Sequence, residues 1–274
     1  MKKEIRNLAG DLKKLISAGS EEDFMIPAKP ARADAAAAVS AEPVLQPAPP
    51  QITKPQTAAP ATATEPAESY TLESIAKQIL SCQRCALGAT RIKAVPGEGN
   101  PKARLMFIGE GPGYEEDRQG RPFVGKAGQL LDKIIAAMGF KREEVFIANM
   151  VKCHPMIDPQ DPEKRGNDRA PVPDEIALCR GYVERQINAV GPDYIVALGG
   201  VAAKSLIRDA KSLSAIRGKI YDLELSSVQL AKPVKILATY HPAALLRNPG
   251  WKKDTWADLK ILLADMGRTP PSAV

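Results

Sequence analysis

Four uninterrupted runs of apolar residues stand out in the chain beyond residue 100. Such runs are typical of strands buried on both faces of a parallel sheet. Between them, apolar residues recur with helical spacing, as along the stripe from Leu130 to Met138. Strands alternating with helices predict an α/β fold, with a three-layer α/β/α arrangement around a central four-stranded parallel sheet. The predicted strands cover residues 104–110, 145–151, 194–199 and 235–240.

The same patterns divide the chain into four parts. Residues 1–20 predict a short amphipathic helix, because their apolar side chains fall on one helical face. Residues 21–68 are rich in Ala and Pro and contain few large apolar side chains, so we expect a disordered linker. The folded domain is predicted over residues 69–268, preceded by this disordered tail. Residues 269–274 are expected to form a second disordered tail.

Helical spacing and turn residues also place the remaining elements of the folded domain. One antiparallel stretch is expected over residues 215–230, between the third and fourth strands. Pro173 stands at the first turn of one helix, where its missing N–H is not needed. The predicted helices cover residues 72–80, 125–138, 173–190, 201–207 and 250–265.

The first strand runs directly into the glycine-rich segment Gly109–Gly113. Glycine allows the backbone to approach a ligand closely, and the segment matches neither a dinucleotide-binding motif nor a P-loop. Ligands of parallel sheets bind beyond the carboxyl ends of the strands. The residues that end the four strands should therefore converge on one edge of the sheet and form a site. These residues are Glu110, Asn149, Gly199 and His241.

Composition and charge favour a polyanionic partner. The formal net charge is +6 and the isoelectric point is near 9.1. There is no apolar run approaching the roughly 18 residues that a membrane span requires. The N-terminus lacks the continuous apolar segment of a secretory signal. We therefore expect a cytoplasmic protein without a membrane-spanning segment.

The four cysteines are expected to bind a metal, because disulfides are rare in such a compartment. Four thiolates suit tetrahedral zinc or an iron–sulfur cluster, and the residue types alone leave both open. His154 is the one adjacent side chain that could compete as a ligand. None of the cysteines lies at the strand edge with His241, so we expect the metal to be structural. They are Cys82, Cys85, Cys153 and Cys179.

Several short motifs occur together in the folded domain: Gly109–Gly113 with Glu116 and Asp117, Pro122–Gly125 with Ala127 and Gly128, Asn149 with Val151–Cys153, and His241–Pro249. In this combination, with the four cysteines in order, the chain resembles the iron–sulfur (family 4) uracil-DNA glycosylases over residues 70–265. The resemblance implies an enzyme that flips uracil out of DNA, hydrolyses its N-glycosidic bond and leaves an abasic site. It also implies a [4Fe–4S] cluster held by the four cysteines.

The resemblance further implies a role for each wall of the pocket. Phe123 would stack on the uracil, and Asn149 would pair with its O4 and N3–H. Cytosine presents the opposite pattern, which leaves polar groups unpaired. His241 would donate to uracil O2 as negative charge builds on the leaving base. Glu116 would exclude the methyl group of thymine.

The resemblance leaves the attacking water without an assigned base. Other uracil-DNA glycosylases, those with a GQDPYH motif, carry an Asp near this water where the present chain has Gly111. Gly111 and Glu110 would line the pocket near the sugar and the base. Glu110 is therefore the residue that we expect to orient the water.

Contacts with DNA are expected from the segment after His241. Leu245, Leu246 and Arg247 resemble the intercalating loop of the family, whose apolar wedge fills the gap left by the flipped base. Further phosphate contacts are expected from Lys126, Lys152 and Lys252.

Two alternative functions stay open at this point. One is a relative that crosslinks covalently to DNA through a His in the loop after the second strand, but residues 156–172 contain no His. The other is a non-catalytic DNA-binding subunit of a replication assembly, against which Asn149 and His241 argue. The expected partners are uracil-containing single- and double-stranded DNA, and a replication or repair protein at residues 1–20. We expect a monomer.

Overall fold

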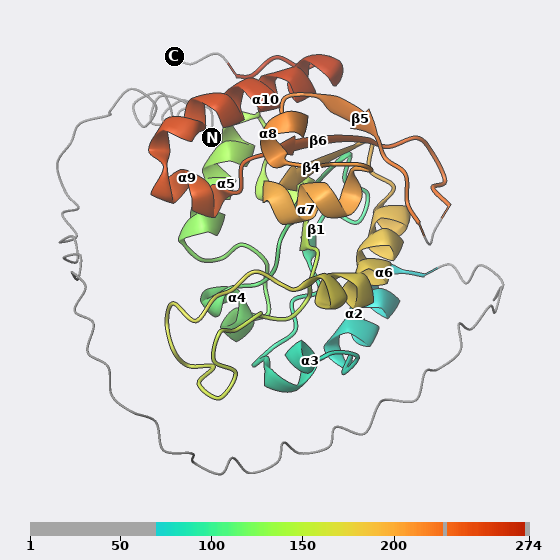
Figure 1. The fold of residues 1–274 in the computed structure, drawn as a ribbon. Coiled ribbons are helices and arrows are strands. Elements are labelled where there is room, and N and C mark those ends of the chain that lie inside the picture. The colour runs from blue at the N-terminus through green and yellow to red at the C-terminus, as the bar shows by residue number, and fades with distance from the viewer. Residues whose placement is uncertain (1–69, 227–228, 272–274) are drawn as a thin grey trace, which may run out of the picture. The chain divides into compact units, whose positions relative to one another are not determined.

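The computed structural model describes residues 70–226 and 229–271 (Figure 1). The helix predicted for residues 1–20 and the linker predicted for residues 21–68 lie outside the described residues. At the other end, Pro271 is half-buried and lies beside Gly139.

The sheet has the strand order β1-β3-β2-β4-β6-β5. Its four central strands are parallel, as the apolar runs predict. The register pairs Gly109 with Asn149, so the two strands that carry them end at the same edge. The central strands are β3 (Phe146–Asn149), β2 (Leu105–Gly109), β4 (Tyr194–Leu198) and β6 (Lys235–Thr239).

An antiparallel strand lies at each edge of the sheet, outside the predicted central sheet of four parallel strands. β5 (Ile220–Asp222) pairs with β6 inside the stretch where an antiparallel excursion is predicted. β1 (Glu98–Gly99) pairs with β3 and contains no apolar run that could reveal it. A Cβ atom at Gly99 would lie 2.0 Å from the Val145 carbonyl oxygen, so this edge pairing depends on glycine.

Helices cover both faces of the sheet, which confirms the three-layer arrangement (Figure 1). Alternate residues of a strand point to opposite faces. In β2, Leu105 and Phe107 pack with one set of helices, and Met106 and Ile108 pack with the other. The first set is α5 (Lys126–Ala137), α9 (Pro242–Arg247) and α10 (Lys252–Asp265); the second is α6 (Pro173–Val190), α7 (Gly199–Leu206) and α8 (Leu213–Ile216).

Several short helices are absent from the sequence-based prediction, because a helix of four to six residues shows no full apolar period. The predicted helix at residues 72–80 is present as α2. No helix in residues 70–226 or 229–271 has the length and apolar character to cross a membrane. The elements not yet described are α2 (Leu72–Leu80), α3 (Ala86–Thr90), α4 (Tyr114–Gln119), η1 (Arg142–Glu144) and η2 (Pro249–Trp251).

Candidate functional site

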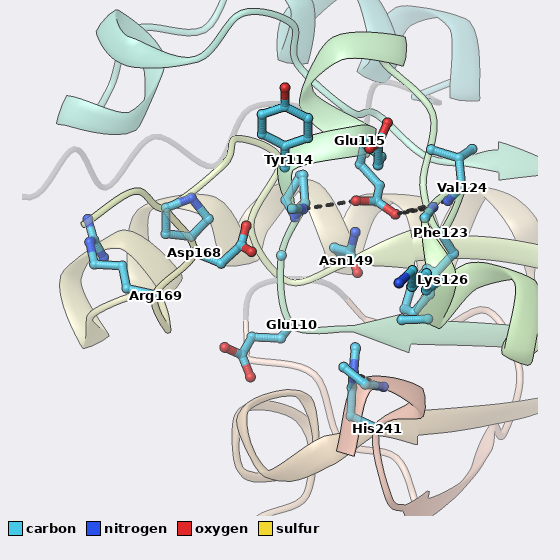
Figure 2. A pocket seen from close by; sticks show the side chains of 18 of the residues that line it. Glu110, Tyr114, Glu115, Phe123, Val124, Lys126, Asn149, Asp168, Arg169 and His241 are labelled. Carbon is cyan, nitrogen blue, oxygen red and sulfur yellow. Dashed lines mark hydrogen bonds between the residues drawn. The ribbon is translucent and has the colours of Figure 1, made fainter. Parts of the chain in front are cut away.

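A cavity of about 800 Å³ opens at the carboxyl edge of the parallel strands (Figure 2). Glu110, Asn149 and His241 line it together, so the convergence expected from the strand ends is found. Gly199 does not line the cavity but lies behind it. A Cβ atom at Gly199 would lie 3.0 Å from the Cβ atom of His241. The edge of the sheet therefore positions the polar groups of the site.

Asn149 is the last residue of β3 and is 2% exposed. Its backbone carbonyl accepts a hydrogen bond of 2.7 Å from the ammonium of Lys152. Its side-chain oxygen Oδ1 has no hydrogen-bond partner among the described residues. A buried, unpaired amide oxygen costs about 1–3 kcal/mol, and a ligand that supplies a donor removes this cost. Asn149 is thus prepared to read the edge of a ligand.

Phe123 forms the wall beside Asn149, in an unusual backbone conformation. Its φ is 52°, a region that side chains other than glycine rarely occupy. Its ring is tilted 32° from that of His241, with the centroids 5.5 Å apart. Gly128 permits this conformation, since a Cβ atom there would lie 1.9 Å from the Phe123 carbonyl oxygen.

Gly109 allows Asn149 and Phe123 to approach each other. A Cβ atom at Gly109 would lie 2.4 Å from Asn149 Oδ1 and 2.5 Å from Phe123 Cζ. Real Cβ atoms do not occupy such positions without displacing their neighbours. The end of β2 must therefore be glycine for the amide and the ring to occupy the same wall.

His241 is the N-cap of α9, and its Nδ1 accepts a hydrogen bond of 3.2 Å from the Ala243 N–H. In the neutral ring, this bond assigns the proton to Nε2. Burial, and then the charge of Arg247, lower the pKa of His241 to about 4. The ring is therefore neutral near pH 7 and offers Nε2–H as a donor.

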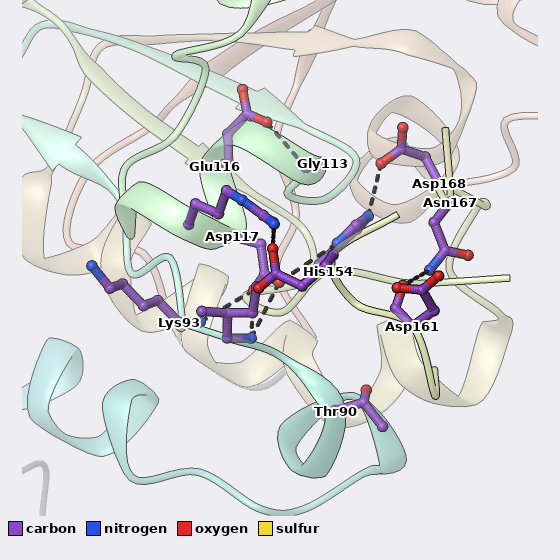
Figure 3. Close-up of polar contacts among 12 residues, drawn as sticks. Thr90, Lys93, Gly113, Glu116, Asp117, His154, Asp161, Asn167 and Asp168 are labelled. Carbon is purple, nitrogen blue, oxygen red and sulfur yellow. Dashed lines mark hydrogen bonds and ion pairs between the residues drawn. The ribbon is translucent and has the colours of Figure 1, made fainter. Parts of the chain in front are cut away.

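Glu116 ties the glycine-rich segment to the segment that carries Phe123. Its Oε1 accepts hydrogen bonds from Val124 N (2.9 Å) and Gly125 N (3.0 Å), and its Oε2 accepts one from Gly113 N (3.2 Å). Figure 3 shows the bond between Glu116 and Gly113. Glu116 also lines the cavity, so the residue predicted to exclude a methyl group also holds two loops together.

Glu110 and Gly111 line the cavity. Burial raises the pKa of Glu110, although Arg247 opposes this. No described residue forms a hydrogen bond with the Glu110 carboxylate. Gly111 has no room for a side chain, because its Cβ atom would lie 2.7 Å from Val151 Cγ2. An aspartate at this position would therefore clash with Val151.

The structure corrects two of the predicted DNA contacts. Leu245 is 1% exposed and packs in the core against α5 and α10, so it is not available as a wedge. Leu246 is 46% exposed, and Arg247 is exposed at the cavity. Lys152 is 1% exposed and donates to Asn149 O and Gln186 Oε1, so it does not reach a phosphate.

The segment after β3 is part of the site, which the sequence analysis does not predict. Residues 165–166 and 168–171 line the cavity. Their buried anchor is Asn167, whose side-chain amide bonds to the backbone at Asp158 and Asp161. Arg165 and Arg118 flank the ring of Tyr114, at 4.8 and 3.8 Å from its centroid. The only feature of the sequence that could have indicated this segment is its position, directly after β3, which ends at the site.

The four cysteines line a second cavity, separate from the first. Cys85 is the N-cap of α3, Cys179 lies on α6, and Cys153 is buried between them. Arg91 donates a hydrogen bond of 2.9 Å to Cys153 Sγ. The thiols and the adjacent cation fit a thiolate-bound group of negative charge. No three His, Cys, Asp or Glu side chains of residues 70–226 and 229–271 are placed as ligands of a single metal ion.

His154 does not compete with these cysteines as a ligand. Its Nε2 lies 2.7 Å from Asp168 Oδ1, and its Nδ1 lies 3.6 Å from Asp117 Oδ2 (Figure 3). Burial disfavours the charged ring, but the two carboxylates outweigh burial and raise the pKa of His154 to about 9. His154 is therefore a cation between two carboxylates.

Comparison with known proteins gives a consistent result. A family model described as the uracil DNA glycosylase superfamily matches residues 96–260. The chain is 38% identical over 205 residues to the type-4 uracil-DNA glycosylase of Archaeoglobus fulgidus, covering 73% of this chain and 96% of that protein. It is 42% identical over 194 residues to the type-4 enzyme of Sulfurisphaera tokodaii, covering 69% and 82%. Similarity to the type-5 enzyme of Pyrobaculum aerophilum is lower, at 28% over 173 residues, covering 58% and 69%.

The lowered pKa of His241 predicts where this ring titrates. Its pKa falls from 6.5 to about 4 on folding, so the unfolded chain binds the proton more readily between these values. The contribution to stability is complete above pH 6.5 and is lost as the pH falls towards 4. An NMR titration of the ring protons will test this, because the chain has only two histidines and His241→Asn removes one signal. A midpoint near 6.5 for His241 would contradict the prediction.

Proposed function

The chain belongs to the uracil DNA glycosylase superfamily, and from this premise we propose that it removes uracil from DNA. It is a DNA repair enzyme that hydrolyses the N-glycosyl bond and leaves an abasic site. The names of its relatives do not favour a crosslinking protein or a non-catalytic subunit. This proposal rests on one observation: a single cavity is lined by the Asn149 amide, the Phe123 ring and a neutral His241.

The cavity suits a base that has left the DNA stack. A base inside a duplex is unreachable, and extruding it costs a few kcal/mol. We propose that the flipped uracil stacks on Phe123 and pairs with the unpaired amide of Asn149, whose Oδ1 accepts from N3–H. Cytosine has no donor at this position, so its binding would leave Oδ1 unpaired and buried.

His241 would stabilise the leaving uracil. As the bond from C1′ to N1 breaks, negative charge develops on the base, and the Nε2–H of the neutral ring can donate to O2. The Ala243 N–H and Gly199 hold the ring in place on its other side. Because the donor is already oriented, little reorganisation accompanies the reaction.

The cysteine cavity supports the proposal of a [4Fe–4S] cluster bound by Cys82, Cys85, Cys153 and Cys179. Such a cluster would join α2, α3, α6 and the segment after β3, and would supply structural support. Lys152 lines the same cavity and donates to the carbonyl of Asn149, so this support extends to the base-reading residue.

We propose that the DNA contacts come from Leu246 and Arg247 at the rim, with Lys126 at the N-terminus of α5. The acceptance of both single- and double-stranded DNA, a monomeric state and action in the cytoplasm are part of the same proposal. A replication or repair partner for residues 1–20 is also proposed, on the basis of the amphipathic pattern alone.

Two substitutions separate the proposed roles of His241 and Asn149. Loss of one preorganised donor typically costs about 10²–10³ in rate, so His241→Ala should slow single-turnover uracil release by this factor and largely retain DNA binding. Asn149→Asp should slow uracil release and weaken discrimination against cytosine, because a carboxylate accepts from the cytosine amine. Labelled oligonucleotides with one uracil or one cytosine, followed by alkali cleavage, measure both effects.

Asn188→Asp on the exposed face of α6 is the matched control for the second substitution and should behave like the wild type. Wild-type rates for His241→Ala would show that His241 is structural and would leave the mechanism without a donor.

The cluster proposal predicts that the purified protein is brown and contains iron and acid-labile sulfide in equal amounts. Cys179→Ser should lower the iron content and the thermal stability together, because one ligand of the cluster is lost. Elemental analysis and a thermal melt measure the two effects. Zinc without iron in the wild-type protein would refute the proposed cluster.

A further inference from the structure

Asp168 is a carboxylate of the cavity for which the steps above provide no role. It lies on the segment after β3, and its side chain is 54% exposed. Figure 2 shows this side chain pointing toward the glycine-rich segment, while the Glu110 carboxylate is turned away from Asn149 and His241. Two acidic side chains therefore line the cavity, and they differ in direction.

The Asp168 carboxylate is held firmly in this position. Its Oδ1 lies 2.7 Å from Nε2 of His154, which is completely buried (Figure 3). On the far side of His154 lies buried Asp117, which accepts hydrogen bonds from the backbone N–H groups of Ile92 and Lys93. The backbone at Asp168 also forms a bridge with Met156. One oxygen, Oδ1, is thus used for anchoring by His154.

The same contacts keep Asp168 ionised. The hydrogen bond from His154 lowers the pKa of Asp168, and the Tyr114 N–H acts in the same direction. Burial acts on Glu110 in the opposite direction and raises its pKa. The pKa values of the two carboxyl groups are therefore shifted in opposite directions.

Asp168 also lies close to the glycine-rich segment Gly109–Gly113, in which Gly111 carries no carboxylate. A Cβ atom at Gly113 would lie 3.3 Å from Asp168 Oδ1, while Val151 leaves no room for a side chain at Gly111. The segment after β3 can therefore supply the carboxylate that the end of β2 cannot.

We propose that Asp168 is a catalytic residue that orients the attacking water and accepts its proton. This inference rests on the proposed glycosylase function. A carboxylate facing polyanionic DNA opposes binding, but it stabilises the positive charge that develops on the sugar in an oxocarbenium-like transition state. Its role is therefore in the reaction and not in affinity.

The step balances without a further reactant. The bond between C1′ and N1 breaks, its electron pair stays with the uracil, and His241 donates to O2 of the uracil. The water oxygen forms a bond to C1′, and one water proton passes to the Asp168 carboxylate and then to solvent. The uracil anion takes a proton from solvent after release.

The test measures uracil release by the full-length protein under single turnover, with a single-stranded oligonucleotide that contains one deoxyuridine. General-base groups typically contribute about 10²–10⁴, so Asp168→Ala should lose about 10² in rate. Asp168→Asn, which keeps the shape of the side chain, should lose rate while it binds a non-hydrolysable 2′-fluorodeoxyuridine oligonucleotide at least as tightly as the wild type. Asp161→Asn on the same segment is exposed and outside the cavity, and is expected to match the wild type.

Chemical rescue separates catalysis from folding. Sodium formate should restore part of the rate of Asp168→Ala, compared with sodium chloride at equal ionic strength, because formate can occupy the space of the missing carboxylate. A loss below tenfold for Asp168→Ala, or a loss that formate does not restore, would overturn the inference. So would a large loss confined to Glu110→Gln, which would assign the water to Glu110. If the wild-type protein itself releases no uracil, the proposed function fails instead.

Discussion

The site depends on the absence of a side chain at the end of β2. Gly109 pairs in register with Asn149, and only a hydrogen atom at its Cα lets the Asn149 amide and the Phe123 ring lie against the same point. Two further glycines extend this constraint. Gly128 accommodates the positive φ of Phe123, and Gly199 lies against His241. The Asn149 amide, the Phe123 ring and the His241 ring are therefore positioned by backbone that carries no side chain.

Hydrogen bonds convert this close approach into a rigid wall. Glu116 spans two loops with three backbone N–H donors, and bonds to a carboxylate are worth about 1.5–3 kcal/mol each. Such support is needed, because a residue in a sparsely populated backbone region costs on the order of 1–3 kcal/mol. On the other side of the sheet edge, buried Lys152 connects the cysteine cavity to the carbonyl of Asn149. The two cavities are thus linked through one side chain.

The sequence predicts the centre of this fold well and its borders less well. Four uninterrupted apolar runs identify the parallel strands, because burial on both faces leaves no polar alternation. β1 leaves no such trace, since it has only two residues. The exposed wedge expected at Leu245 rests on the family resemblance alone, and α9 turns this side chain into the core. Asn149 and His241 are predicted from the strand ends, whereas the position of Asp168 depends on its contact with buried His154, which the apolar pattern does not reveal.

The central claim is that a glycine at position 109 brings the base-reading amide and the stacking ring together. Gly109→Ala should slow single-turnover uracil release by about 10²-fold, since misplacing a reacting group by about 1 Å can cost this much. Gly200→Ala is the matched control, because a Cβ atom there meets nothing within 4 Å. The account predicts a large loss for Gly109→Ala with a folded, DNA-binding protein, and a wild-type rate for Gly200→Ala. A wild-type rate of uracil release for Gly109→Ala would contradict it.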